Sequence, residues 1–350
     1  MHGDDIYNPD CGDIIMWMRF LVAGLIFLAL IFVVNVPAAQ AADPFGQIEI
    51  REWTVDYGGL PRDPDAVSAD EIWFVGQVGD YIGRLDPQTG AFFKRDLDDE
   101  PGPHNLIVGA DGIVWYAGNL DGYIGRYDPD TDQIERINMP DAAARDPHTL
   151  IFDAQNRFIW FTVQNGNFVG RLDPETRDVR LIAVPTSRAR PYGIKQAPDG
   201  TLWVALLGTN KLASIDPETF ELREHLLPDG ARPRRIGVTD QGHVFYTGYA
   251  RGVLGRINPA NGQIDEWPMP GGKNSRPYGM AVDHENRVWA VEGGRPAMFV
   301  GFDPEQEKYI SNTPIGSGGV TVRHMDFNLE TKSVWFGSDA GTIGQAHVGQ

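Results

Sequence analysis

Cysteine is almost absent from this 350-residue sequence, because Cys11 is its single thiol. It lies within the first 41 residues, which we interpret below as a leader, so the rest of the chain contains no cysteine. Disulfide bonds, thiol nucleophiles and cysteine-ligated metals are therefore excluded from the functional part of the protein. The sequence also contains no phosphate-binding glycine loop, dinucleotide-binding fingerprint, zinc-ligand spacing or hydrolase nucleophile elbow.

Positive charge is scarce as well. The sequence has 30 Lys and Arg residues against 48 Asp and Glu residues, a formal net charge of −18. A protein that binds nucleic acid through its phosphates carries a basic surface, so we expect no nucleic-acid partner. Hydrophobic residues make up 42% of the sequence and aromatic residues 11%, which is too much for a disordered chain.

The long apolar run of the chain covers residues 21–36, after Arg19 and before Ala39-Gln40-Ala41. This order is typical of a secretory signal peptide, so we predict that residues 1–41 are a signal peptide, cleaved after Ala41, of a periplasmic or secreted protein. Met16 and Met18 are alternative starts within it. The other interpretation is an uncleaved leader that attaches the protein to a membrane, although the run is shorter than the about 20 residues of a full span.

Residues 42–350 contain seven copies of one pattern, which we predict to form a single domain. Each copy begins with Pro61, Pro103, Pro147, Pro191, Pro233, Pro277 or Val322, and each contains one aromatic residue at a fixed place: Trp73, Trp115, Trp160, Trp203, Phe245, Trp289 or Trp335. Short apolar runs separated by Asp-Gly and Asp-Pro turns indicate four strands per copy, and no segment has a sustained helical period. Repeated four-stranded units of about 40–50 residues are typical of a β-propeller.

We therefore predict an all-β fold, a seven-bladed β-propeller with four-stranded antiparallel blades. The seventh copy has only three strand patterns before Gln350, whereas residues 47–55 resemble the fourth strand of the other copies. This N-terminal strand is expected to complete the last blade and close the ring, which would hide its open edges.

Several phrases of the repeats resemble the virginiamycin B lyase (streptogramin lyase) family of seven-bladed propellers. They include PYGI at 191–194, PYGM at 277–280, IGRLDP at 82–87 and IGRYDP at 124–129. The resemblance implies a lyase that linearises a cyclic depsipeptide by elimination at its ester. In that reaction a histidine takes the proton, and Mg²⁺ near a glutamate stabilises the developing negative charge. Our leading interpretation is an exported, metal-assisted lyase for a cyclic ester or peptide-like compound, with Mg²⁺ (or Ca²⁺) as its cofactor.

The family's catalytic positions are only partly matched. Its histidines directly follow the prolines that open blades six and seven, and these positions hold Tyr278 and Arg323, with His324 one residue later. The family's metal-binding glutamate falls on Asp339, and Glu292 matches a common Trp-Phe-Thr-Glu phrase. The resemblance thus implies His324 as a catalytic candidate and Glu292 and Asp339 as metal ligands. A one-residue offset turns a strand side chain to the other face unless a bulge intervenes.

The residues that follow the seven opening positions form a second candidate site. The first strand of each propeller blade lines the central channel, so these residues are expected to meet there. In chain order they are Arg62, His104, His148, Tyr192, Arg234, Tyr278 and Arg323. The set predicts a positive, aromatic funnel for a small polar or anionic ligand.

His104 and His148 occupy equivalent places in neighbouring blades, and either is a candidate general base near neutral pH. Gln164 and Asn119 are their expected hydrogen-bond partners, and Asp146 is placed to orient His148.

Two further functions stay open at this point. The first is a non-catalytic propeller that uses the same funnel for an anionic cell-envelope ligand or partner. The second is a calcium-dependent lactonase. In each case we expect a monomer.

Overall fold

The protein is described here by a computed structural model that covers residues 45–349. The leader predicted for residues 1–41 lies outside the described residues. Within the described part, no helix is long and apolar enough to cross a bilayer, and the helical element found there is a single 3₁₀ turn, Gly272–Asn274.

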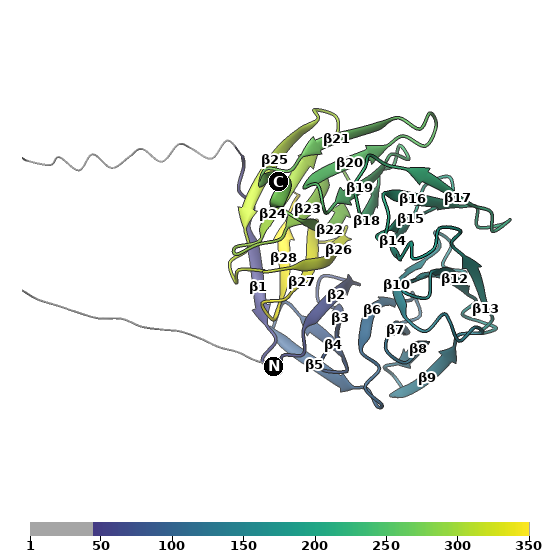
Figure 1. The fold of residues 1–350 in the computed structure, drawn as a ribbon. Coiled ribbons are helices and arrows are strands. Elements are labelled where there is room, and N and C mark those ends of the chain that lie inside the picture. The colour runs from purple at the N-terminus through teal and green to yellow at the C-terminus, as the bar shows by residue number, and fades with distance from the viewer. Residues whose placement is uncertain (1–44, 350) are drawn as a thin grey trace, which may run out of the picture. The chain divides into compact units, whose positions relative to one another are not determined.

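Seven sheets, each with four antiparallel strands, are arranged in a ring (Figure 1), and we call the axial region that their inner strands face the channel. Blade one comprises β2 (Pro61–Ala66), β3 (Ile72–Gly76), β4 (Tyr81–Asp86) and β5 (Ala91–Asp96), and blade two comprises β6 (Pro103–Val108), β7 (Val114–Gly118), β8 (Tyr123–Asp128) and β9 (Gln133–Asn138). Blade three comprises β10 (Pro147–Phe152), β11 (Ile159–Val163), β12 (Phe168–Leu172) and β13 (Val179–Ala183), and blade four comprises β14 (Pro191–Gln196), β15 (Leu202–Leu206), β16 (Lys211–Ile215) and β17 (Leu222–Leu226). The predicted fold class is confirmed.

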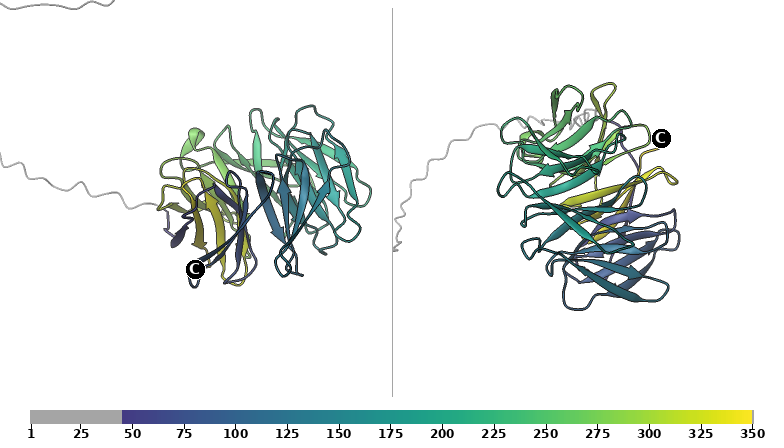
Figure 2. Two further views of the ribbon diagram at one scale, coloured as in Figure 1. Left: turned by 90° about the horizontal axis from the view of Figure 1, so that it is seen from below. Right: turned by 90° about the vertical axis from the view of Figure 1, so that its right-hand side faces the viewer.

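The other three blades follow the same order. Blade five comprises β18 (Pro233–Val238), β19 (Val244–Gly248), β20 (Val253–Ile257) and β21 (Ile264–Pro268). Blade six comprises β22 (Pro277–Val282), β23 (Val288–Glu292), β24 (Met298–Asp303) and β25 (Lys308–Pro314). Blade seven comprises β26 (Val322–Asn328), β27 (Ser333–Ser338), β28 (Thr342–His347) and β1 (Ile50–Thr54), which pairs antiparallel with β28 from Ile50–Ala346 to Thr54–Thr342. The N-terminal strand therefore closes the ring, as predicted, and Figure 2 shows the blades from two other sides.

The repeated aromatic residues lie on the second strand of each blade and are fully buried. A second aromatic position on that strand explains the glycine in the IGR phrases. A Cβ atom at Gly125 would lie 2.1 Å from the Tyr116 ring, and one at Gly170 would lie 2.1 Å from the Phe161 ring. Glycine is required at this close approach because any side chain would displace a core aromatic residue.

Each inner strand begins at one of the predicted opening residues and contains a β-bulge directly after it. In blade two, for example, Pro103 pairs with Gly118 but Leu106 pairs with Tyr116, so His104 and Asn105 share one position of the partner strand. The same register shift occurs in five other blades, and in blade one it falls one residue later, after Arg62. A bulge re-aims side chains and ends regular pairing, so each blade presents two consecutive residues near the axis.

Candidate functional site

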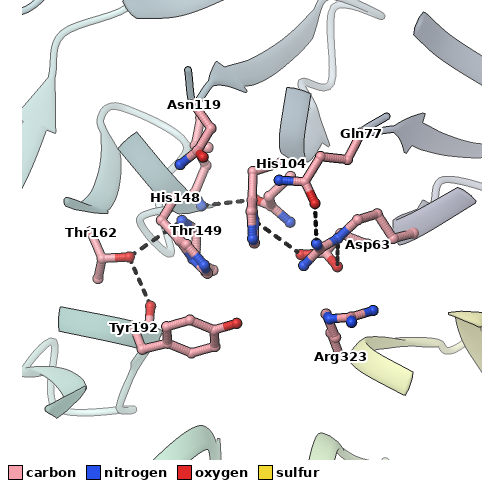
Figure 3. Close-up of polar contacts among 12 residues, drawn as sticks. Asp63, Gln77, His104, Asn119, His148, Thr149, Thr162, Tyr192 and Arg323 are labelled. Atoms are coloured by element: carbon pink, nitrogen blue, oxygen red, sulfur yellow. Dashed lines mark hydrogen bonds and ion pairs between the residues drawn. The ribbon is translucent and has the colours of Figure 1, made fainter. Parts of the chain in front are cut away.

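A buried charge network occupies the channel side of blades one, two, three and five (Figure 3). At its centre is the Asp63 carboxylate, which accepts a hydrogen bond from Arg62 Nε at 3.2 Å and one from Arg235 NH2 at 3.3 Å. The Asp63 and Arg235 side chains are almost completely buried. Burial alone would raise the pKa of Asp63, but the Arg62 and Arg235 guanidiniums hold it below its usual range.

Arg62 and Arg235 extend this network to neighbouring blades. Arg62 NH1 donates to Gln77 Oε1 at 2.5 Å. Arg235 NH1 donates to Thr149 Oγ1 at 3.0 Å, and its Nε donates to the Arg323 carbonyl at 2.6 Å. One carboxylate and several neutral acceptors thus compensate the two buried guanidinium groups. The same hydrogen bonds connect the inner strands of different blades.

His104 and His148 lie against each other within the network. Their ring centroids are 3.5 Å apart, and the His148 ring is 4.1 Å from that of Tyr192. His148 Nδ1 is hydrogen-bonded to Thr149 Oγ1 at 2.9 Å, whereas His148 Nε2 and His104 Nδ1 have no hydrogen-bond partner among the described residues. His104 Nδ1 lies 3.9 Å from Asp63 Oδ2, a contact drawn as a dashed line in Figure 3.

Burial also sets the protonation of the histidines. Only 6% of His104 and 1% of His148 is exposed. Burial, together with the nearby Arg62 and Arg235 charges, lowers the pKa of both imidazoles well below the usual range. Burial and Arg235 lower the pKa of His324 to about 3. All three imidazoles are therefore neutral near pH 7.

The opposite side of the channel mouth is open and contains a pocket of about 540 Å³ between blades five, six and seven. Four arginines line it: Arg234, Arg276, Arg295 and Arg323. The other lining residues are Tyr249, Asn274, Tyr278, Gly293, Gly294, Val320 and Thr321, so no carboxylate of residues 45–349 lines this cavity. We call it the arginine pocket.

Arg234 is the most firmly positioned cation of the arginine pocket. Its guanidinium lies 3.8 Å from the Tyr249 ring centroid and 4.3 Å from that of Tyr278. Its Nε is buried without a hydrogen-bond partner among residues 45–349. Two aromatic rings thus hold the charge by cation–π contacts while its donors stay free. The Tyr278 hydroxyl in turn is hydrogen-bonded to that of Tyr192, which connects the pocket to the buried network.

The two candidate metal ligands have other partners. Asp339 forms an ion pair with Arg323 NH1. Glu292 Oε1 accepts the Gly271 backbone N–H at 2.7 Å, and burial raises the pKa of its carboxyl group. Within residues 45–349, no three His, Cys, Asp or Glu side chains come close enough together to hold a metal ion.

The structure divides the predicted funnel. Arg62, His104, His148 and Tyr192 are buried and do not line the arginine pocket, whereas Arg234, Arg323 and the largely buried Tyr278 line it. His324 lies near Asp63 and Arg235, because the bulge of β26 brings both Arg323 and His324 near the channel.

The residues expected to be partners of the histidines have other contacts. Asn119 Nδ2 donates to the Pro147 carbonyl, and the Gln164 backbone N–H donates to the Asp146 carbonyl at 3.4 Å. The expectation that Asp146 orients His148 is wrong, because its two oxygens accept hydrogen bonds from Asn165 and Gly166. His148 is oriented by Thr149 instead.

Four important residues were not singled out in the sequence. Asp63 and Arg235 stand two positions after the opening proline, where the bulge makes a second residue face the channel. Arg276 directly precedes an opening proline, and Arg295 lies in the loop between β23 and β24. A comparison of the residues one position before and two positions after each opening proline would have identified Asp63, Arg235 and Arg276 from the sequence.

Solved structures with this fold include a streptogramin B lyase, with 21% identity, a TM-score of 0.77, and coverage of 87% of this chain and 99% of that one. Virginiamycin B lyase from Staphylococcus aureus has 20% identity, a TM-score of 0.77, and coverage of 86% and 99%. Hydrazine synthase from Kuenenia stuttgartiensis has 15% identity, a TM-score of 0.68, and coverage of 83% and 96%.

None of the curated proteins matches the chain significantly. The model of the virginiamycin B lyase family matches residues 48–295, which include the inner strands of six blades. This match, together with the shared seven-bladed fold, leads to one conclusion: the chain belongs to the virginiamycin B lyase family.

Proposed function

We propose that this protein binds a small anionic ligand in the arginine pocket at the mouth of its channel. The observation that carries the proposal is the convergence of four guanidiniums on one cavity in a chain with a net charge of −18. Guanidinium groups match the planar, bidentate geometry of carboxylate, sulfate and phosphate groups.

The free charge of the pocket supports this assignment. Arg323 is neutralised by Asp339, but among the described residues Arg234, Arg276 and Arg295 have no carboxylate within ion-pair distance. Arg276 and Arg295 are exposed at the rim, whereas Arg234 is half-buried between its two tyrosines. An anion in the cavity would therefore find unpaired guanidinium donors both at the rim and in the interior. Charge-assisted hydrogen bonds are strong at such a partly desolvated site.

Mg²⁺, which the family implies, does not fit the side chains at this site. A hard cation prefers several oxygen ligands, whereas the arginine pocket presents four cations and no lining carboxylate. Asp339 is bound by Arg323, and Glu292 lies outside the pocket lining. The same donor set gives no support to a calcium-dependent lactonase. We therefore derive no catalytic step that uses a metal.

The positions of the histidines favour binding over the lyase reaction of the relatives. A general base has to come within hydrogen-bond reach of the proton that it removes. His104, His148 and His324 do not line the arginine pocket, and their lowered pKa values make them weak bases. The family's two histidine positions hold Tyr278 and Arg323, whose side chains are suited to ligand recognition.

Calorimetric titration with citrate at low ionic strength tests the proposal. We expect saturable binding that weakens as salt rises, and a loss of at least about tenfold in affinity in the double variant Arg276→Ala/Arg295→Ala. Arg223→Ala, which removes an exposed arginine of β17, is the matched control and should bind like the parent. Equal affinities in all three proteins would overturn the proposal, as would Mg²⁺-dependent conversion of a cyclic depsipeptide to a linear product that chromatography resolves.

A further inference from the structure

We infer that the natural ligand is an acidic polysaccharide, a chain of uronate sugars that extends from the arginine pocket across blades five and four. This inference rests on the proposed function, because it identifies the class of anion that the same pocket receives. It is carried by three arginines outside or at the edge of the cavity, which we call the arginine arc: Arg190, Arg232 and Arg276.

The three residues occupy one equivalent position in consecutive blades. Each directly precedes the proline that opens an inner strand, β14, β18 or β22, so all three lie at the same mouth of the channel. Each is exposed. Arg276 lines the pocket, and Arg232 and Arg190 continue the row away from it. Packed sheets are about 10 Å apart, so neighbouring arginines of the arc are separated by a distance on that order.

The backbone at this position is left-handed in five of the seven blades. The φ angles of Arg190, Arg232 and Arg276 are +56°, +45° and +51°, and blades one and two have Leu60 and Gly102 at the equivalent place with φ angles of +56° and +53°. The turn therefore accepts residues other than glycine, at a cost of about 1 kcal/mol or more in this region. What distinguishes the arc is that three consecutive blades have arginine at this turn.

The guanidiniums of the arc have no electrostatic partner within residues 45–349. Several arginines of the outer strands and loops are paired with carboxylates, as Arg95 is with Asp132 and Arg177 with Glu135. Among the described residues, no carboxylate lies within ion-pair distance of any arc arginine. Unpaired guanidiniums in a row, at a spacing of about one blade, match a ligand that carries several anionic groups rather than one.

The opposite side of the mouth carries the opposite charge. The loop that leads into blade two contains the exposed Asp98, Asp99 and Glu100, and the next loop at this mouth contains the exposed Asp121. These carboxylates repel an anionic chain. The loop of Arg232 also contains an exposed carboxylate, Asp229, which accepts a hydrogen bond from Asn210, but the three arginines of the arc outnumber it. The favourable path of the ligand therefore runs from the pocket over blades five and four.

The surface along the arc favours a saccharide over a polynucleotide. Proteins that bind single-stranded nucleic acid stack its bases on exposed aromatic rings. The exposed aromatic residues of the described chain, Tyr57 and Phe93, lie at blade one, outside the arc. Binding of a uronate chain along the arc would rest on its carboxylates, which pair with the guanidinium groups.

A length series of oligogalacturonates tests the inference by calorimetry at low ionic strength. We expect the hexamer to bind at least about tenfold more tightly than the monomer, because it reaches the arc as well as the pocket. The variant Arg190→Ala/Arg232→Ala should lose about tenfold in hexamer affinity and keep the monomer affinity of the parent. Arg223→Ala should change neither.

The outcomes separate the two proposals. Equal affinity for monomer and hexamer, or no effect of Arg190→Ala/Arg232→Ala, overturns the polysaccharide path but leaves the pocket as an anion site. Monomer binding that is unchanged in Arg276→Ala/Arg295→Ala overturns the proposed function itself. Tighter binding of a single-stranded oligonucleotide with as many charges as the hexamer overturns the assignment to a saccharide.

Discussion

Arg323 and Asp339 form an ion pair that joins the start of β26 to the loop after β27, at the edge of the arginine pocket. Both side chains are partly buried, and the interaction with Asp339 raises the pKa of Arg323 although burial opposes it. By the family pattern, these two positions would hold a proton-abstracting histidine and a metal-binding glutamate. In this protein the two positions hold Arg323 and Asp339, whose opposite charges neutralise each other. The net charge of the pocket is therefore determined by its other arginines.

Asp339→Asn should therefore strengthen anion binding. The change removes the carboxylate that offsets Arg323 but keeps a polar side chain of the same size. A charge a few ångströms from the ligand at a partly exposed site contributes on the order of 1 kcal/mol, so we expect an about fivefold gain in citrate affinity at low salt, which fades as salt increases. Asp199→Asn, in an exposed turn of blade four, is the control. A weaker affinity in Asp339→Asn would show that this carboxylate serves the site directly.

Arg234 should depend on the shape of its side chain as well as on its charge. Arg234→Met removes both the cation and its free donors, and we expect a loss of about tenfold or more in citrate affinity. Arg234→Lys keeps the charge but loses the planar stacking between Tyr249 and Tyr278, so an intermediate affinity is expected. Calorimetry of the two variants decides the point. An affinity equal to that of the parent in both variants would mean that Arg234 contributes neither charge nor geometry.

The sequence predicts the architecture of this protein well because its repeat is periodic. Seven opening residues, seven buried aromatic positions and a spare strand at the N-terminus predict the blade count and the closure by β1, and both are confirmed. Each of these features follows from local turn chemistry and packing that recur once per blade.

The candidate site was harder to predict, because its position depends on burial and on pairing between blades. The repeat shows that Arg62 and Arg234 are equivalent, but only the fold reveals that Arg62 is buried beside Asp63 whereas Arg234 faces a cavity. The bulge that brings Asp63 and Arg235 to the channel is not marked by one residue type, so the sequence does not reveal it. The ion pair between Arg323 and Asp339 depends on how β26 and β27 are aligned, which the sequence does not reveal either.

The buried histidine pair should stay uncharged across the physiological pH range. Burial and the neighbouring arginines lower the pKa of His104 and His148 well below that of a free imidazole. We expect NMR spectra of ¹⁵N-labelled protein to show neutral rings for both residues from pH 8 down to pH 5. The same protein unfolded in urea should titrate near pH 6.5. Titration of either ring near pH 6.5 in the folded protein would contradict the buried arrangement and restore that histidine as a candidate base.

A pair of acidic residues at the other end of the inner strands should make stability depend on pH. Burial and the nearby Asp326 carboxyl group raise the pKa of Asp65 to about 7. Its ionisation therefore costs stability above pH 7, and this cost is absent below the unfolded-state pKa of about 4. Asp65→Asn keeps an acceptor for the Val108 N–H, which bonds Asp65 at 2.6 Å.

We expect Asp65→Asn to raise the free energy of unfolding at pH 8 by on the order of 2 kcal/mol and to give no gain at pH 4. Urea denaturation at the two pH values measures the difference. Asp130→Asn, an exposed turn residue, should show no comparable dependence on pH. A gain that is equal at both pH values would mean that Asp65 ionises normally and that the substitution acts through packing.

Closure of the ring should depend on β1 and on Trp53 in particular. Trp53 stacks on the buried Trp335 with ring centroids 5.6 Å apart, and Glu52 accepts hydrogen bonds from Ser317 and Thr342. Trp53→Ala should lower the free energy of unfolding by about 2–3 kcal/mol, less than a fully buried tryptophan because this ring is half-buried. Loss of the strand would expose the edge of β28, which is a template for pairing with another chain. We therefore also expect faster aggregation on mild heating, measured by light scattering.

Phe93→Ala on the outer strand β5, whose ring lies edge-on to Trp73, is the matched control because β5 does not close the ring. If Phe93→Ala aggregates as readily as Trp53→Ala, aggregation reflects the general loss of an aromatic contact rather than the opening of the ring.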